Sequence, residues 1–229
     1  MDGTIDNSAE VAMSHTETTN GENANYYRAD RPEMLKLLPA ATARLLELGC
    51  GEGAFSAAAK RRFGAECWAM EYNPAVATKA SAVLDRVLVG DADQHIDELP
   101  DDYFDAIVCN DVLEHLAHPQ QTLMRLRPKL RTGGVVVASI PNIRYLPALS
   151  RIIFGRDFPL EDDGTFDRTH LRWFTRKSIW RMFDAAGYQV QSMRGHNMGN
   201  PLAVAIGILS LGFFWDGVWM QYKCVATPQ

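Results

Sequence analysis

The alternation of short apolar strands with helical segments constrains the fold of this chain more than any other feature of its sequence. Helical patterns such as "AFSAAAKRRF" and "PQQTLMRLRPKL" separate runs of strand character, and "RPEMLKLL" precedes the first of them. These runs cover residues 44–48, 66–71, 86–89, 104–110 and 135–140. Regular strand–helix alternation predicts a doubly wound α/β fold, in which helices cover both faces of a mostly parallel sheet. Ligands of such sheets bind at the carboxyl ends of the strands, where the strand order reverses.

A glycine-rich turn follows the first predicted strand, in the stretch "LLELGCGEGAF". Gly49, Gly51 and Ala54 satisfy the dinucleotide pattern G-x-G-x-x-G/A, while Gly49, Gly51 and Gly53 satisfy G-x-G-x-G. The motif alone leaves both readings open. A nicotinamide-dependent oxidoreductase is the hypothesis that the first pattern supports.

Acidic residues beside the turn favour the second pattern. A pyrophosphate site uses backbone amides and a helix N-terminus to hold negative charge, whereas Glu47 precedes this turn and Glu52 lies within it. No lysine or arginine lies nearby in the sequence, so the turn suits S-adenosylmethionine, which carries ammonium and sulfonium groups and no phosphate. Glu71 follows the glycines by about twenty residues, where a carboxylate can accept both ribose hydroxyls of either cofactor. Asp91, after the third strand, can reach an adenine amino group, although each acid alone could be a solvated strand-end carboxylate.

Five motifs between Leu45 and Asn142 resemble those of the class I S-adenosylmethionine-dependent methyltransferases in order and spacing: "LLELGCGEGAF", "WAMEYNP", "VLVGDAD", "FDAIVCNDVLEHLAHP" and "RTGGVVVASIPN". The resemblance implies a Rossmann-like, seven-stranded, mostly parallel sheet with a reversed C-terminal strand, in which "YQVQSMRG" and "VWMQYKCVA" are the last two strands. It implies that the glycine turn contacts the methionine portion of the cofactor, and that the cavity for methyl transfer lies at the end of the fourth strand. The cofactor-binding set so implied is Glu47, Gly49, Cys50, Gly51, Gly53, Glu71, Tyr72, Asp91, Ala92, Asn110 and Asp111.

The stretch "FDRTHLRWFTRKSIWRMFDAAGY" is similar to the branch of this family that methylates small molecules, including sugars in bacterial polysaccharide and natural-product pathways. We therefore expect methyl transfer to a small-molecule acceptor, at a hydroxyl. N- or C-methylation of a small molecule and a non-enzymatic binding module on the same scaffold are the alternatives.

Two histidines are the candidate catalytic residues. The sulfonium is already electrophilic, so the enzyme aligns the reacting groups and excludes water, but a hydroxyl nucleophile must also lose a proton. Histidine has a suitable pKa for this step. His170, in a polar connection after the fifth strand, is the preferred base, and His115 is the second candidate. In the alternative interpretation, His115 orients the backbone after the fourth strand and His170 pins its loop through a hydrogen bond to Asp167 or Asp111.

A divalent-metal site is a further hypothesis for the same residues. Asp111, Glu114 and His115 occupy one helical turn, and with His170 they supply two carboxylates and two imidazoles. The pattern is similar to D/E-x-x-E-H followed by a distant histidine in ubiquinone-pathway O-methyltransferases and small-RNA 2'-O-methyltransferases, where a metal is thought to bind the accepting hydroxyls. Many relatives with E-H at this position have no known metal. The sequence therefore favours His170 as a simple base over a metal.

Residues 141–174 are predicted to be an insert that covers the substrate. Between residues 144 and 181, eight basic residues face five acidic ones, so arginines there could hold a phosphate or carboxylate of an anionic acceptor. Surface ion pairs between the loop and the helices explain the same charges equally well.

Composition limits the domain organisation, compartment and partners. At 229 residues, with 47% hydrophobic content, the chain fits one domain, expected at 25–229 after a polar, disordered tail at 1–24 that lacks the features of a targeting peptide. An excess of acidic residues, 28 against 23 basic, argues against duplex nucleic acid as a partner. Four scattered cysteines without C-x-x-C spacing indicate a reducing, cytoplasmic location.

One uncharged segment, residues 201–215, has to be considered as a membrane element. It is shorter than the roughly 20 residues that a spanning helix needs. We expect a buried helix or a homodimer interface here, with a lid over an apolar substrate or a membrane-surface contact as the alternatives.

Overall fold

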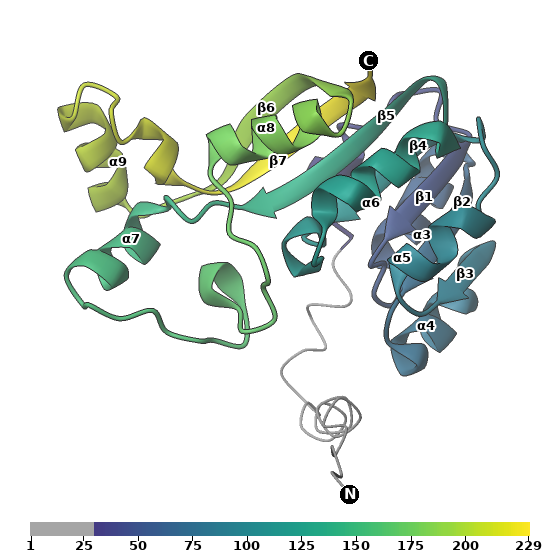
Figure 1. Ribbon diagram of the computed structural model, residues 1–229, viewed down its shortest axis with the longest axis horizontal. Helices are drawn as coiled ribbons and strands as arrows, with labels where there is room; N and C mark the ends of the chain where they lie inside the picture. The colour runs from purple at the N-terminus through teal and green to yellow at the C-terminus, as the bar shows by residue number, and fades with distance from the viewer. Residues whose placement is uncertain (1–29) are drawn as a thin grey trace, which may run out of the picture.

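The computed structural model describes residues 30–229, which form a seven-stranded sheet with helices on both faces (Figure 1). The order of strands is β3-β2-β1-β4-β5-β7-β6, and the bounds are Arg44–Leu48 for β1, Glu66–Glu71 for β2, Arg86–Val89 for β3, Phe104–Asn110 for β4, Leu130–Pro141 for β5, Tyr188–Met198 for β6 and Trp219–Pro228 for β7. The first five strands pair in parallel, whereas β7 is antiparallel to both β5 and β6. The predicted fold class, including the reversed C-terminal strand, is confirmed. The tail predicted at residues 1–24 lies outside the described residues.

The helices alternate with the strands as the sequence pattern predicts. The α-helices are α2 (Pro32–Leu35), α3 (Ala54–Phe63), α4 (Pro74–Ser81), α5 (Ala92–His95), α6 (Pro119–Leu126), α7 (Leu146–Ile153), α8 (Arg176–Ala185) and α9 (Pro201–Leu209). Short 3-10 turns are η2 (Ile96–Glu98), η3 (Leu113–His115), η4 (Arg127–Lys129), η5 (Gly164–Phe166) and η6 (Trp215–Val218). Capping sets several boundaries: the Asn73 side chain accepts hydrogen bonds from the first turn of α4, and Gly64 ends α3 in the left-handed conformation. In the described part of the chain, every helix is too short or too polar to cross a bilayer.

Several element boundaries differ from the sequence prediction, and two of these differences have a clear local cause. The helix expected to continue to Leu130 ends at Leu126, because Pro128 has no backbone N–H to donate and its ring crowds the preceding turn. The fifth strand begins at Leu130 rather than Val135, since a register shift between Phe104 and Ala106 of β4 lets the strand pair on both sides of the irregularity.

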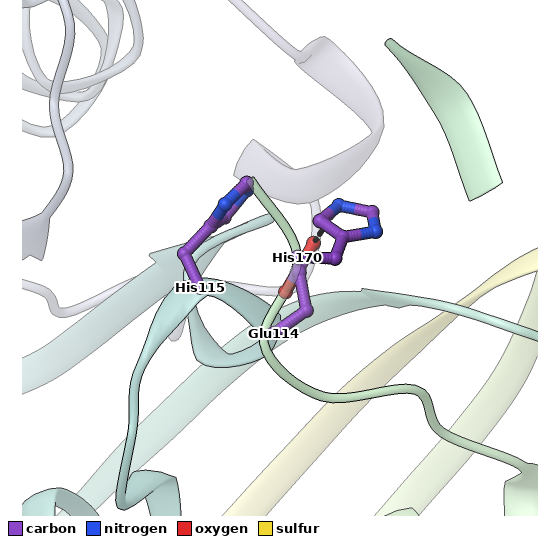
Figure 2. A group of neighbouring side chains, drawn as sticks. All are labelled: Glu114, His115 and His170. Carbon is purple, nitrogen blue, oxygen red and sulfur yellow. Dashed lines mark ion pairs between the residues drawn. The ribbon is translucent and has the colours of Figure 1, made fainter. Parts of the chain in front are cut away.

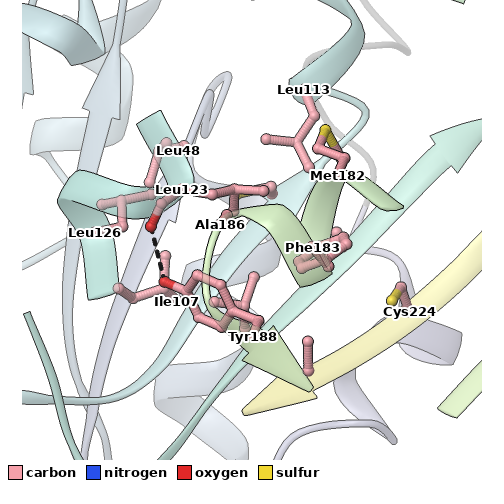
Figure 3. Packing of buried hydrophobic residues seen from close by; sticks show 14 of the residues in the cluster. Leu48, Ile107, Leu113, Leu123, Leu126, Met182, Phe183, Ala186, Tyr188 and Cys224 are labelled. Carbon is pink, nitrogen blue, oxygen red and sulfur yellow. Dashed lines mark hydrogen bonds between the residues drawn. The ribbon is translucent and has the colours of Figure 1, made fainter. Parts of the chain in front are cut away.

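A hydrophobic cluster lies on each face of the sheet. On one face, Ile107 of β4 packs with Leu123 of α6 and Phe183 of α8 (Figure 3). Tyr188 is buried in the same cluster, and its hydroxyl donates a 3.0 Å hydrogen bond to the Leu123 carbonyl. On the other face, Leu45 packs with residues of α2 and α3, among them Phe55. Both faces of β1 and β4 are therefore covered, which holds the carboxyl ends of these strands in one register.

Candidate active site

The glycine turn lies at the carboxyl end of β1, as predicted. Gly49, Gly51 and Gly53 all have positive φ, at 64°, 56° and 83°, a region that costs any residue with a Cβ atom. A Cβ on Gly49 would lie 2.6 Å from Cγ2 of Val112, which follows β4. The backbone therefore requires glycine at all three positions, which is the G-x-G-x-G pattern.

Glu71, at the end of β2, is tied to this turn. Its two carboxylate oxygens accept hydrogen bonds of 2.9 Å from the backbone amides of Gly51 and Asn73, and burial raises the pKa of Glu71. Each oxygen has a second acceptor position, so the carboxylate retains room for two hydroxyl donors. Asp91, by contrast, is exposed and caps α5 by accepting from the amide of Asp93. Three other residues of this edge were predicted to bind the cofactor. Cys50 is buried in the glycine turn, Tyr72 is exposed after β2, and Ala92 is half-buried at the start of α5.

Glu47 does not contribute its charge to the surface of the turn. It is buried, and it accepts hydrogen bonds from Oγ of Ser56 at 2.6 Å and Nδ2 of Asn110 at 3.1 Å. Burial raises the pKa of Glu47 to about 7. Among residues 30–229, Oδ1 of Asn110 is a buried acceptor without a hydrogen-bond partner.

The fold brings a basic residue to the turn, although none lies nearby in the sequence. Nζ of Lys79, on α4, lies 2.7 Å from Oε1 of Glu52. The two residues are 27 positions apart in the sequence, and the fold of α4 beside the turn brings them together. The acidity that favoured a cationic cofactor at the sequence level is therefore partly neutralised in the fold.

Asp111 joins three parts of the molecule at the end of β4. It has a left-handed backbone conformation, with φ of 52°, and its carboxylate accepts hydrogen bonds from Arg31, from Oγ of Ser139 at 2.6 Å and from Nε2 of Gln221 at 3.2 Å. Arg31 is the residue that precedes α2. Through one carboxylate, α2 is thus bound to the carboxyl ends of β4 and β5 and to the amino end of the antiparallel strand β7.

A cavity of about 180 Å³ opens next to Asp111. Its titratable lining residues come from three separate parts of the sequence and are Arg31, Asp111, Glu114, His115, Asp163, Asp167 and His170. All four residues of the predicted metal set line it, although the hydrogen bonds of Asp111 tie that carboxylate to its neighbours. Among the described residues that line it, four carboxylates outnumber the guanidinium of Arg31, so the cavity favours a cation over an anion.

Glu114, His115 and His170 form the closest group in the cavity (Figure 2). One ligand atom from each lies within 4.8 Å of the others, and the imidazole rings of the two histidines are 4.8 Å apart between centroids. Glu114 is 1% exposed, and neither of its oxygens has a hydrogen-bond partner in residues 30–229. Burial and the charge of Asp111 raise the pKa of Glu114 well above its ordinary value. Burial and the neighbouring His115 lower the pKa of His170, so its imidazole is neutral at pH 7.

Backbone hydrogen bonds hold these three side chains together. The Glu114 carbonyl accepts from the amides of Leu171 and Arg172 at 2.9 and 3.0 Å, and the amide of His170 donates to the Asp167 carbonyl at 3.0 Å. This bond between His170 and Asp167 belongs to the backbone, and Nδ1 of the His170 imidazole has no hydrogen-bond partner among the described residues. Nδ1 of His115 lies 3.0 Å from Oγ1 of Thr169.

Sequence reasoning missed Ser139 and Gln221. Ser139 reaches Asp111 because β5 pairs with β4 at Asn110, and Gln221 because β7 pairs with β5 at Pro141. No local motif marks either residue, since both positions depend on strand register. Arg31 is also brought to the site only by the fold, because it lies 80 positions before Asp111 in the sequence.

Three of the basic residues in the insert form ion pairs. Arg151 pairs with Glu161 at 2.6 Å, and Arg168 pairs with Asp162 at 2.8 Å. Arg144 pairs with Asp216 at 2.7 Å. These contacts favour the surface-pair interpretation of the basic excess over an anion site.

Comparison with known proteins identifies the class that this fold and site define. Residues 21–193 match the family described as "Methyltransferase domain", and the chain belongs to this family. It is a class I S-adenosylmethionine-dependent methyltransferase, and S-adenosylmethionine is its cofactor.

Two curated relatives and one solved structure show the extent of the similarity. The chain is 31% identical over 160 residues to a ubiquinone biosynthesis O-methyltransferase of Aeromonas salmonicida, which covers 66% of this chain and 65% of the relative. It is 33% identical over 103 residues to a malonyl-[acyl-carrier protein] O-methyltransferase of a Paenibacillus species, covering 41% of this chain and 37% of the relative. The chain thus spans less than two thirds of the length of these relatives. A methyltransferase structure from Archaeoglobus fulgidus shares the fold, with a TM-score of 0.67, 17% identity and coverage of 89% of this chain and 96% of that one.

Proposed function

We propose that this methyltransferase transfers the methyl group to a hydroxyl of a small-molecule acceptor bound in the cavity beside Asp111, and that Glu114, His115 and His170 hold a divalent cation there. The observation that carries the proposal is the buried, unpartnered carboxylate of Glu114 between two imidazoles. A buried carboxylate without a partner is costly, and a cation bound by one oxygen and two imidazole nitrogens would stabilise it. The two relatives described above are both named O-methyltransferases.

The residues of the chain divide between cofactor and acceptor. Glu71 has acceptor positions left for the ribose hydroxyls, and the unpartnered Oδ1 of Asn110 is suited to an N–H donor such as the ammonium of the methionine portion. Where no cation occupies it, the neutral imidazole of His170 can take a proton from the acceptor hydroxyl. A bound cation would act as a Lewis acid that lowers the pKa of a coordinated hydroxyl.

General-base catalysis by His170 without a cation is the second candidate mechanism. The unpartnered Nδ1 of His170 and the lowered pKa of this residue support it. Both mechanisms need His170, and they differ in whether activity requires a cation.

The identity of the acceptor follows in part from the charge of the cavity. Four carboxylates and one guanidinium line it, so a neutral acceptor or one bridged by a cation fits better than a bare phosphate or carboxylate. A sugar or natural-product pathway is suggested by the resemblance of residues 166–188 alone.

We further propose that residues 25–229 form one domain. We place the protein in the cytoplasm, since all four cysteines are free and buried.

The test is a product assay with and without chelation. The enzyme is incubated with S-adenosylmethionine and either catechol or aniline as probe acceptors, and products are identified by mass. Methylation of catechol, its loss after treatment with EDTA and its return with Mg²⁺, Mn²⁺ or Zn²⁺ support the proposal. Full activity after exhaustive chelation would remove the cation and leave His170 as the base. Methylation of aniline alone would overturn the assignment of an oxygen acceptor.

A further inference from the structure

The outer face of α9 and the turn that follows it expose six large apolar side chains. We call this set the α9 surface, and Figure 1 shows α9 at one end of the molecule, away from the strands β1 to β4. The exposed fractions of these side chains range from 43% to 99%. The residues of the α9 surface are Leu202, Ile208, Leu209, Leu211, Phe213 and Trp215.

The inner face of α9 is built from small residues and cannot exchange places with the outer face. Ala203 and Gly207 are buried, and a Cβ on Gly207 would lie 2.8 Å from Cγ2 of Val218. The helix therefore approaches η6 too closely for a leucine to take the place of Gly207. The side chain of Asn200 caps α9 by accepting from the amide of Ala203 at 3.0 Å. Because only small residues fit on the inner face of α9, the large apolar side chains lie on its outer face.

The area of the α9 surface matches one side of a protein interface. Six large side chains with these exposed fractions present on the order of 800 Å² of apolar area, taking roughly 200 Å² for each when fully exposed. The largest apolar patch of a typical monomer is about 300–600 Å². A specific interface of standard size buries about 800 Å² on each partner.

The absence of charge on the α9 surface distinguishes between a membrane, residues 1–24 and a second copy of the chain as the group that covers it. Residues 201–215 contain no charged side chain, and the adjacent Asp216 is neutralised by Arg144 at 2.7 Å. Apolar helices that lie on membranes carry lysines and arginines along their polar border, which this segment does not. Residues 1–24 are predominantly polar in sequence and offer few apolar side chains to cover six large ones. An identical uncharged surface on a second copy matches both the chemistry and the area.

We propose that two copies of this chain associate through their α9 surfaces, with the same residues of each copy in contact across a two-fold axis. Such an isologous contact is the usual arrangement in homodimers. This inference goes beyond the proposed methyl transfer and does not depend on the identity of the acceptor.

Sedimentation velocity of the full chain between 1 and 50 µM tests the proposal. We expect a dimer for the wild type and a dissociation constant at least about tenfold weaker for L209E and L211E, because each places two unpaired carboxylates in the apolar contact. Both positions are highly exposed in the monomer, so the fold tolerates the charge. W180E, which alters a half-exposed side chain on α8 outside the surface, should remain dimeric and serves as the control.

Three outcomes would overturn the proposal. A wild type that is monomeric at 50 µM excludes the dimer, and a dimer unaffected by L209E and L211E places the contact elsewhere. A monomer that cosediments with phosphatidylcholine vesicles, and loses this binding in L209E, identifies a lipid surface as the occupant.

Discussion

Nε2 of His170 lies 3.9 Å from Oε1 of Glu114, and both side chains are almost fully buried. This distance is too long for a hydrogen bond, so the carboxylate and the imidazole face each other without satisfying each other. The pair is stable in this arrangement only if the carboxyl is protonated or if a third group joins them. A divalent cation that also contacts His115 is such a group, and this explanation leads to the first prediction.

Replacing Glu114 with Gln should weaken the binding of Mn²⁺ or Mg²⁺ at least about tenfold, because an amide oxygen supplies no negative charge to the cation. Isothermal titration calorimetry on the chain stripped of metal measures the affinity. H118A, which removes an exposed imidazole outside the cavity, is the matched control and should bind the cation normally. Equal cation affinity in E114Q and wild type would separate Glu114 from any metal site.

Loss of the His170 imidazole should lower turnover by a factor of roughly 100 to 10,000 in H170A and H170Q, the range expected when a general base is removed. Affinity for S-adenosylmethionine and thermal stability should stay near normal. The remaining activity should rise with pH, as the acceptor hydroxyl ionises without help. Wild-type turnover would exclude His170 from the mechanism, and a parallel loss of stability would indicate that it only pins the loop.

The sequence predicted most of the fold, because strand and helix periodicity and the glycine spacing are local signals. The bounds of β1, β2, β3, β4 and α3 match the sequence reading, and the predicted reversed strand is β7. Contacts across the sheet were not predictable, since Asp111 meets Ser139 and Gln221 only through strand register. The surroundings of Glu47 were also misjudged, because its spacing from the turn does not reveal that the side chain points to Ser56.

The carboxylate of Glu71 should be the main anchor of the cofactor ribose. E71Q removes the negative charge but keeps one acceptor oxygen, so S-adenosylhomocysteine should bind about 1–3 kcal/mol less tightly, which calorimetry can measure. E66Q, at the other end of β2, is the control and should leave the affinity unchanged. An unchanged affinity in folded E71Q would show that the ribose binds elsewhere.

Glu47 should make the stability of the protein depend on pH. Its pKa is raised from 4.5 to about 7 in the fold, so the folded state holds this proton more tightly than the unfolded state. The resulting stability is fully present below pH 4.5 and is lost as pH rises through about 7, a change of about 3 kcal/mol at roughly 1.4 kcal/mol per pKa unit.

Urea denaturation without cofactor at pH 5, 6, 7 and 8 measures this effect. The free energy of unfolding of the wild type should fall relative to that of E47Q as pH rises, because glutamine does not titrate. D184N, which neutralises an exposed carboxylate on α8, should run parallel to the wild type. A constant difference between wild type and E47Q across this range would contradict the raised pKa.

The contact between Gly49 and Val112 should set the geometry of the cofactor turn. G49A adds a Cβ at 2.6 Å from Cγ2 of Val112 and also places an alanine at positive φ, which alone costs about 1–2 kcal/mol. We expect G49A to lose more stability than G133A, since Gly133 has φ of 81° but no atom within 4 Å of an added Cβ. In the double variant G49A/V112A, the shorter side chain at position 112 should restore the stability lost through the steric clash. The loss caused by the positive φ at position 49 should remain. Thermal and urea denaturation of the two single variants and the double variant measure this coupling, and additive losses in G49A and V112A would show that the turn relaxes away from Val112.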